Sequence, residues 1–390
     1  MTYLLLPRPA AAPRAPASPS RFDVRSTWHP RPERFRLSER GQIVFPRRAA
    51  AVTAAAAALN AGPPVPAGVT QSFHILPCGL RLEVLSASPA APSLARRPPL
   101  VFVHGSYHAA WCWAERWIPY FVDAGWDCRA LSLRGQGGGE AVPLPVAGTL
   151  QLIAADLAHY LRSESFGPER PPPVLIAHSF GGLVAQLLAG TSYFPQLSGL
   201  VLLASAPPSG NQKLVGRTFL RDPLFGAALT YAFITRAFAT NAYLCRASFF
   251  SPGLPEADVA RYMASIERSC PAGLRLLDLR ALVTILPIRA PPPHLRPPTL
   301  VVGGDLDRVV DVEALEETAA EWGAGPPVVL RGVAHDLMLD QEWREGAGAV
   351  RRWLEERVLP NGPGSGDDVA AADVEDPEVP AGASVKLEGL

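Results

Sequence analysis

The sequence predicts an α/β fold in which helices flank a mostly parallel central sheet. Short runs rich in Val, Ile and Leu alternate along the chain with segments of helical periodicity, as they do in α/β proteins. These runs are apolar throughout, which is typical of strands buried on both faces. Between residues 209 and 298 the alternation stops, and apolar helical segments replace the strands. We therefore expect a helical cap inserted before the strand that begins at residue 299.

The first expected elements are two strands joined by a turn. Residues 73–76 and 80–85 flank a Pro-Cys-Gly turn and predict a hairpin. The apolar runs 99–103 and 127–133 predict two buried strands, each followed by glycine. Between them, residues 109–125 carry apolar and aromatic side chains at helical spacing.

The middle of the chain continues the same alternation. Residues 149–163 predict a helix, on which we expect Asp156 to lie at the surface or near the cap. A buried strand at 174–178 runs into Ser179 and a helix start, and residues 200–204 predict another strand. The cap interval then contains three helical segments, at 225–235, 259–269 and 272–286.

After the cap the sheet resumes. Residues 299–303 and 327–330 predict strands, and residues 312–322 and 341–358 predict helices. Ligands of such sheets bind at the carboxyl ends of the strands, where a cap can shape a pocket and exclude water.

These elements divide the chain into five parts. The core is expected over 71–208 and 299–359, with the cap at 209–298 between its two halves. Residues 1–70 are expected to be a disordered extension, and residues 360–390 an acidic disordered tail with seven acids and one lysine.

The composition of residues 1–60 predicts a targeting segment. They hold ten arginines, three acids and no lysine, which is typical of organellar transit peptides. We expect a chloroplast location. A mitochondrion, the thylakoid lumen and the cytoplasm are the alternatives, because a plain disordered extension from a GC-rich genome would have a similar composition.

The totals argue against several classes of protein. The formal net charge is zero, whereas a nucleic-acid-binding protein should carry a basic excess. The five cysteines form no C-x-x-C pair, so we expect neither a disulfide framework nor a metal site, and no organic cofactor is implied. No apolar run reaches 18 residues, so no transmembrane helix is expected, although peripheral membrane contact is left open.

Residues 174–183 carry the strongest chemical motif. Four apolar residues and His178 lead into Ser179, and Gly181 and Gly182 follow. This order resembles a nucleophile elbow, a tight strand-to-helix turn that exposes a serine, with Ala177 in place of the first glycine of G-x-S-x-G. Small residues are needed there because larger ones would crowd the turn.

An acid and a base follow in the order that such a serine requires. Residues 303–307 end a buried strand with Asp305 and Asp307, and His335 follows the last strand. Asp307 is preferred over Asp305 because the extra turn lets its carboxylate reach the next loop. The other seven histidines precede Ser179 or flank a proline-rich linker, and Asp336 is expected to be a charge near a helix start.

The oxyanion of acyl transfer needs backbone donors. The N–H of Phe180 is one candidate, and the N–H of Ser106 or Tyr107 is the other. His104 is expected to bond loop backbone, and His178 to pack or bond beside the elbow.

Taken together, these motifs resemble the α/β-hydrolase superfamily over about residues 73–358. Residues 104–113 (H-G-S-Y-H-A-A-W-C-W) are similar to the H-G-x-x-H-x-A-W-x-W stretch of plant methylesterases and hydroxynitrile lyases. The other carriers are residues 134–137 (R-G-Q-G), 177–182 (A-H-S-F-G-G), 304–307 (G-D-L-D) and 335–338 (H-D-L-M).

The resemblance implies Ser179 as nucleophile, Asp307 as orienting acid and His335 as base. Ala177 and Ala109 stand where glycine is usual, and neither change removes a catalytic group. We expect a lid-bearing serine hydrolase that cleaves a small, apolar ester, with lysophospholipase-like substrates as one guess. A hydroxynitrile-lyase-type lyase and a non-catalytic receptor or scaffold are the alternatives, and the oligomeric state is left undetermined.

Overall fold

The computed structural model describes residues 36–37, 43–44, 60, 62–90, 97–142, 145–164, 171–191, 197–270 and 287–359. The chain divides into two units, Met1–Ala51 and Val52–Leu390. In the first unit, β1 (Arg36–Leu37) pairs antiparallel with β2 (Ile43–Val44). The rest of the predicted targeting segment, up to residue 59, and the acidic tail lie outside the described residues.

Over its described residues, the second unit is built on an eight-stranded sheet with the order β10-β9-β8-β7-β5-β6-β4-β3. Only β4 runs against its neighbours β3 and β6, and the other pairs are parallel. The α/β fold with a mostly parallel sheet is therefore confirmed. The strands are β3 (Thr70–Ile75), β4 (Arg81–Ala87), β5 (Leu100–Val103), β6 (Cys128–Leu131), β7 (Val174–His178), β8 (Gly199–Leu203), β9 (Thr299–Gly304) and β10 (Val328–Leu330).

The register of the central strands brings their carboxyl ends to one edge of the sheet. Val103 at the end of β5 pairs with Ala177 of β7, and His178 pairs with Leu203 at the end of β8. Leu203 in turn pairs with Val302 of β9. The loops after these strands therefore meet at one edge, as the sequence predicted for the loops that carry the motifs.

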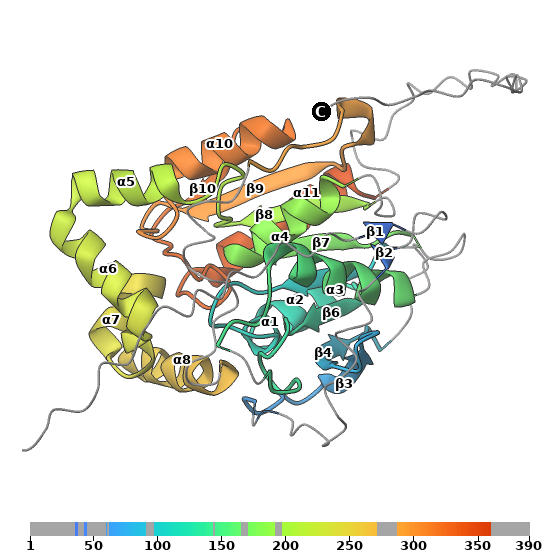
Figure 1. Ribbon diagram of the computed structural model, residues 1–390, viewed down its shortest axis with the longest axis horizontal. Coiled ribbons are helices and arrows are strands. Elements are labelled where there is room, and N and C mark those ends of the chain that lie inside the picture. The colour runs from blue at the N-terminus through green and yellow to red at the C-terminus, as the bar shows by residue number, and fades with distance from the viewer. Residues whose placement is uncertain are drawn as a thin grey trace, which may run out of the picture. The chain divides into compact units, whose positions relative to one another are not determined.

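Helices cover both faces of the sheet (Figure 1). On one face, α3 (Leu150–Ser163) packs against α4 (Phe180–Ala189), and Trp322 of α10 (Val312–Trp322) donates a 3.0 Å hydrogen bond to Gln186 of α4. On the other face, α2 (Trp117–Asp123) contacts α11 (Trp343–Arg357). The short α1 (Trp111–Ala114) precedes α2, and its aromatic side chains are buried.

The described part of the cap interval is mostly helical, and its helices extend along one side of the sheet (Figure 1). Local capping sets their bounds: the Asp222 side chain accepts from Phe225 N at the start of α6, and Asn241 does the same for Leu244 N in α7. Residues 271–286, where the third predicted helix falls, lie outside the described residues. The cap elements are α5 (Gln212–Arg221), α6 (Pro223–Thr235), η2 (Ala237–Ala239), α7 (Ala242–Phe249) and α8 (Glu256–Ser269), and η3 (Pro293–Leu295) leads back to β9.

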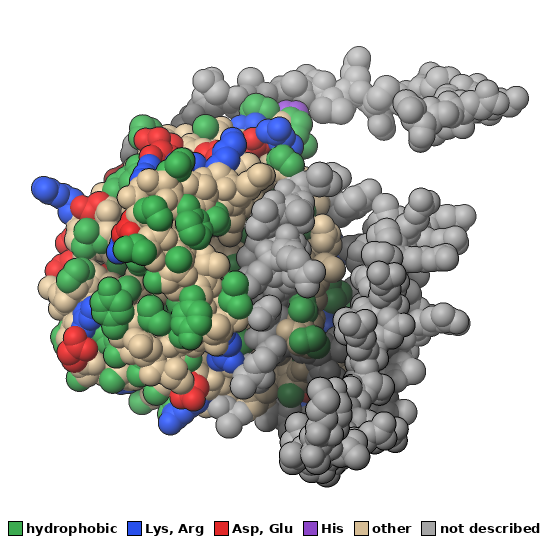
Figure 2. Space-filling model, turned by 60° about the vertical axis from the view of Figure 1, so that its left-hand side comes forward, with side chains coloured by type: hydrophobic (Ala, Val, Ile, Leu, Met, Phe, Trp, Pro, Cys, Tyr) green, Lys and Arg blue, Asp and Glu red, His purple; other side chains and the backbone are tan. Residues whose placement is uncertain are grey.

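The outer face of the cap carries exposed apolar side chains. Leu220 and Leu224 are 85% and 84% exposed, and Tyr243 is also exposed. Figure 2 shows hydrophobic side chains distributed over this face of the molecule. Among the described residues, no helix combines the length and the apolar character needed to span a bilayer.

Two details differ from the sequence-based expectation. Asn60 donates from its backbone N–H to the Gly139 carbonyl and from its side chain to the Gly135 carbonyl, so core contacts begin before residue 70. Asp156 is not a surface charge: it is buried and forms a bidentate ion pair with Arg134, with both N–O distances at 2.8 Å. Asp156 lies three residues after Ile153 and four before Tyr160, both buried, so it is on the buried face of α3.

Candidate active site

Ser179 occupies a strained turn between β7 and α4. Its φ of 53° and ψ of −120° lie in a region that non-glycine residues rarely adopt. Three backbone hydrogen bonds hold the turn: Ser179 N–H donates to the Leu203 carbonyl, and the Ser179 carbonyl accepts from Gly182 N and Ala206 N. The strain is therefore sustained by the neighbouring strand and helix.

Close packing explains why small residues surround Ser179. A Cβ on Gly181 would lie 2.3 Å from the His104 carbonyl oxygen, and one on Gly105 would lie 2.8 Å from the Ser179 Cβ. The first contact is with backbone, and the second is with the Cβ of Ser179, whose turn is itself constrained, so neither contact can yield cheaply. Ala177 is fully buried and is accommodated at the position where glycine is usual.

The three residues predicted as a catalytic triad meet at the carboxyl edge of the sheet. His335 Nε2 lies 2.9 Å from Ser179 Oγ, and His335 Nδ1 lies 2.8 Å from Asp307 Oδ2. The second carboxylate oxygen of Asp307 accepts from Val309 N and Val310 N at 2.7 and 2.9 Å. The structure thus places a serine, an imidazole and a fixed carboxylate in one hydrogen-bonded chain.

The electrostatics of His335 suit a base that gains a proton during the reaction. Burial alone would lower the pKa of His335, but attraction to Asp307, the hydrogen bond to Asp307 and attraction to Asp336 outweigh burial and raise it. The pair can therefore hold an imidazolium in a site that water hardly reaches.

Asp305, the alternative acid, is not the partner of His335, whose Nδ1 contacts Asp307. Its Oδ1 accepts from Gly332 N at 2.6 Å and so ties the loop after β9 to the loop after β10. Asp305 is thus a loop-bracing residue, and Asp307 is the acid that the geometry brings to the histidine.

The candidate oxyanion donors flank Ser179. Phe180 is the first residue of α4, where backbone N–H groups have no acceptor within the helix. Across from it, Tyr107 has a φ of 66°, so the loop after β5 is also strained. His104 braces this loop: its Nε2 accepts from Leu133 N at 2.9 Å and its Nδ1 donates to the Gly105 carbonyl at 2.7 Å. Burial lowers the pKa of His104 to about 3, which keeps this ring neutral.

A second buried group of ionisable residues lies beside His335. Asp336 is fully buried, with Oδ2 2.8 Å from His108 Nε2, so the expectation of a charge at a helix start is wrong. His178 Nε2 donates to the His335 carbonyl at 2.9 Å, in keeping with the expectation that it bonds beside the elbow. The role of Asp336 was not predicted, although the apolar residues on both sides of His335 and Asp336, at 333–334 and 337–339, indicate burial.

The cap contacts the site through aromatic side chains and through Ser251, which donates to the Asp340 carboxylate in the loop after β10. Phe249 of α7 packs 6.3 Å from the His335 ring, and the Tyr107 ring packs against Phe233 and Phe238 at 5.7 and 4.8 Å. The role of Asp340, which links this loop to the cap, was not predicted. The Asp340 carboxylate accepts from Ala334 N, beside His335, at 2.7 Å. It also accepts from the backbone N–H and the hydroxyl of Ser251 in the cap, and from Gln341 N.

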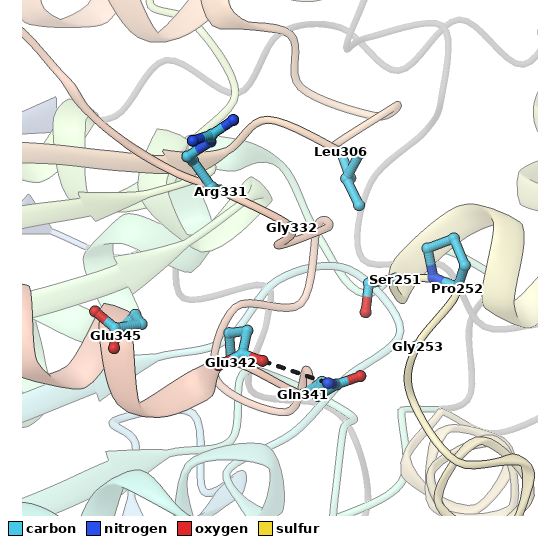
Figure 3. Close-up of a pocket in the computed structure, with 9 residues that line it drawn as sticks. All are labelled: Ser251, Pro252, Gly253, Leu306, Arg331, Gly332, Gln341, Glu342 and Glu345. Atoms are coloured by element: carbon cyan, nitrogen blue, oxygen red, sulfur yellow. Dashed lines mark hydrogen bonds between the residues drawn. The ribbon is translucent and has the colours of Figure 1, made fainter.

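An open depression of about 340 Å³ lies on the outer side of this link. Figure 3 shows Gln341 and Glu342 joined by a hydrogen bond beneath Ser251 and Pro252. None of the three triad residues lines the depression, so we do not assign the substrate to it. The residues that line it are Ser251, Pro252, Gly253, Leu306, Arg331, Gly332, Gln341, Glu342 and Glu345.

His178, His335 and Asp336 offer ligand atoms within 4.8 Å of one another, a spacing that a metal ion could use. However, both ring nitrogens of His335 contact Ser179 and Asp307, and the Asp336 carboxylate pairs with His108. Hydrogen bonding and ion pairing therefore account for this cluster among the described residues.

Together, the sheet order, the elbow and the hydrogen-bonded serine, histidine and aspartate define a protein of the α/β-hydrolase class. Residues 100–349 match the sequence profile described as the alpha/beta hydrolase family, and the chain belongs to that family.

Similarity to curated relatives is local. The chain is 34% identical to methylesterase 10 of Arabidopsis thaliana over 87 residues, which are 22% of this chain and 30% of that protein. It is 30% identical to human protein phosphatase methylesterase 1 over 107 residues, or 27% of each chain. The chain thus matches less than a third of the length of either relative.

Solved structures share the fold more broadly. An esterase from Thermogutta terrifontis covers 74% of this chain and 100% of its own, with a TM-score of 0.54 and 21% identity. An epoxide hydrolase from Vigna radiata covers 74% and 99%, with a TM-score of 0.53 and 19% identity. At such identities the likeness shows the fold alone, and the two names show that one fold serves different reactions.

Proposed function

We propose that this protein is a serine hydrolase that cleaves carboxylic esters through an acyl-enzyme. The observation that carries the proposal is the continuous contact from Ser179 Oγ through His335 to Asp307, with distances of 2.9 and 2.8 Å, at a strained elbow. The family includes other chemistries, so the ester bond is part of the proposal.

In the proposed mechanism, His335 Nε2 takes the Ser179 proton as Oγ attacks the ester carbonyl. Asp307 holds the Nδ1–H and stabilises the imidazolium, and the N–H of Phe180 faces the oxyanion together with that of Ser106 or Tyr107. The imidazolium then protonates the departing alcohol. Water, activated by the same histidine, attacks the acyl-enzyme and releases the acid.

The surroundings of the triad support an ester with an apolar portion. Phe233, Phe238 and Phe249 of the cap form aromatic contacts with one another, and the first two also contact Tyr107. Local similarity to two methylesterases supports including methyl esters among the substrates to be screened.

The alternatives have less support. A lyase of the hydroxynitrile-lyase type would place a lysine at the site, but the one lysine in the cap interval, Lys213, is exposed on α5. A non-catalytic scaffold would not need the serine–histidine–aspartate contacts.

The decisive test replaces Ser179 by alanine. Fluorophosphonate labelling and hydrolysis of p-nitrophenyl esters of graded chain length should be abolished in S179A. Both should persist in S163A, because Ser163 is an exposed serine at the end of α3. Equal hydrolysis by S179A and the parent, or no labelling of the folded parent, would overturn the proposal.

A further inference from the structure

The pair formed by His108 and Asp336 lies directly behind the loop that carries the candidate oxyanion donors. His108 Nε2 is 2.8 Å from Asp336 Oδ2, and His108 Nδ1 is 3.0 Å from the Ser106 carbonyl oxygen. Both side chains are buried, at 1% and 0% exposure. His108 is also fixed by packing, since its ring stacks on Trp111 at 5.9 Å and meets Phe249 edge-on at 5.4 Å.

The two contacts of His108 restrict its protonation state. A carbonyl oxygen and a carboxylate oxygen are both acceptors, whereas a neutral imidazole donates from one nitrogen only. The contact between Nε2 and Oδ2 is an ion-pair distance and not an aligned hydrogen bond, because neither His108 Nε2 nor either carboxylate oxygen of Asp336 has a hydrogen-bond partner among the described residues. A neutral ring would leave this buried carboxylate without a counter-charge. The buried charge is compensated if the imidazole carries two protons, and it is absent if the carboxyl group is protonated.

The groups around Asp336 favour the ionised carboxylate. Burial raises the pKa of Asp336, but the contacts with His108, and more weakly with His178 and His335, outweigh burial and lower it. His178 is not the counter-ion, because burial lowers its own pKa to about 3. Among the described residues, Asp336 also acts on two buried thiols, Cys112 and Cys245, whose pKa values are raised by burial and then by Asp336.

We propose that His108, held as an imidazolium by Asp336, is a positioning residue for the oxyanion-binding loop. The Ser106 carbonyl and the Tyr107 N–H belong to one planar peptide unit and point in opposite directions. A bond from His108 to that carbonyl therefore fixes where the Tyr107 N–H points and stabilises the positive φ of Tyr107. The Ser106 N–H, the alternative donor, is in the adjoining unit and is constrained with it.

This inference rests on the proposed ester hydrolysis, since it concerns stabilisation of the oxyanion in the same site. The proposed role of His108 in orienting the oxyanion donors can be distinguished by experiment from a role in packing alone. A packing role would affect folding stability, whereas a positioning role affects the transition state more than substrate binding.

The kinetic test compares H108Q and D336N with H159Q, which alters a histidine paired with His74 away from the site. We expect kcat to fall about tenfold to hundredfold in H108Q, somewhat less than for loss of an oxyanion donor, with KM changed by less than about twofold. Affinity for a trifluoromethyl ketone, which forms a tetrahedral adduct, should fall by the same factor. H159Q should match the parent.

D336N has a further readout in the pH profile. His335 is faced by Asp307 and Asp336, which raise its pKa, while burial lowers it. Neutralising Asp336 therefore lowers the pKa of His335, and the acidic limb of kcat/KM should move to lower pH. An unchanged acidic limb in D336N, together with an unchanged kcat in H108Q, would overturn the proposal.

Nitrogen NMR of the 15N-histidine-labelled parent tests the charge state without relying on activity. The signals of His108 are identified as those missing from H108Q. We expect this ring to have both nitrogens protonated at pH 7.5 in the parent and to lose this signature in D336N. A neutral tautomer for His108 in the parent would overturn the proposal even if the variants did not fold. If the parent cleaved no ester, the proposed function would fail, whereas the NMR result would still decide the state of the pair.

Discussion

Replacing Asp307 by asparagine tests whether the carboxylate determines the tautomer of His335. Asparagine has nearly the same shape but can offer either its oxygen or its NH2 group to each side. Oδ1 of Asp307 accepts two backbone N–H bonds, from Val309 and Val310. Keeping those bonds directs the amide oxygen toward Val309 and Val310 and the NH2 group toward His335 Nδ1.

The magnitude follows from this orientation. Two retained hydrogen bonds at roughly 1 kcal/mol each favour it by about 2 kcal/mol over the flipped amide. With the NH2 group facing Nδ1, the imidazole must carry its proton on Nε2, where it cannot accept the Ser179 proton. Loss of imidazolium stabilisation adds to this effect. We expect kcat to fall about 10⁴-fold, or about 5 kcal/mol in the barrier, with little change in the free energy of unfolding.

The assay is hydrolysis of a p-nitrophenyl ester by D307N, with pre-steady-state acylation measured across pH. Because Asp307 raises the pKa of His335, any residual activity should have its acidic limb at lower pH than the parent. D305N is the matched control, since the Asp305 carboxylate accepts from Gly332 N, whereas His335 Nδ1 contacts Asp307, and it should retain most activity. A D307N rate within threefold of the parent, or a collapse in D305N alone, would refute the assignment of the acid.

Three further predictions concern stability and location. G181A should lower the free energy of unfolding by about 3 kcal/mol in urea titrations, because its Cβ would lie 2.3 Å from the His104 carbonyl oxygen; equal stability would show that the elbow can relax. Burial raises the pKa of Asp156 despite Arg134, so R134A should cost about 3–5 kcal/mol while the double change R134M/D156L costs less; an equal or larger loss in the double variant would contradict this account. Residues 1–70 fused to a fluorescent protein should direct it to chloroplasts, and diffuse cytosolic fluorescence would count against targeting.

The sheet was predictable because apolar runs and helical periodicity depend on local sequence. The order of Ser179, Asp307 and His335 was also visible, since each follows a predicted strand and the carboxyl ends of parallel strands share an edge. The structure places these three residues together. Their catalytic roles remain part of the proposal.

The surroundings of the site were not predictable in the same way, because their partners are distant in sequence. Asp336 is adjacent to His335, but His108 lies in the loop after β5, and nothing local to either residue indicates the pairing. The burial of Asp156 was easier to predict from local sequence. Asp156 lies three residues after Ile153 and four before Tyr160, both buried, so its position on the helix indicated the side that faces the core. Asn60 contacts glycine carbonyls, which leave no pattern in the sequence.

The link between the cap and the loop that carries His335 limits how the cap and the core can be recombined. The Phe249 carbonyl accepts from Asp336 N, and Ser251 donates to the Asp340 carboxylate, so the two segments are joined at two points that follow His335 in the chain. A cap taken from another family member would therefore have to restore both bonds to keep His335 in register. Chimeras that exchange residues 209–248 and retain 249–251 should preserve the alignment of the histidine, whereas junctions placed after residue 251 should lose it.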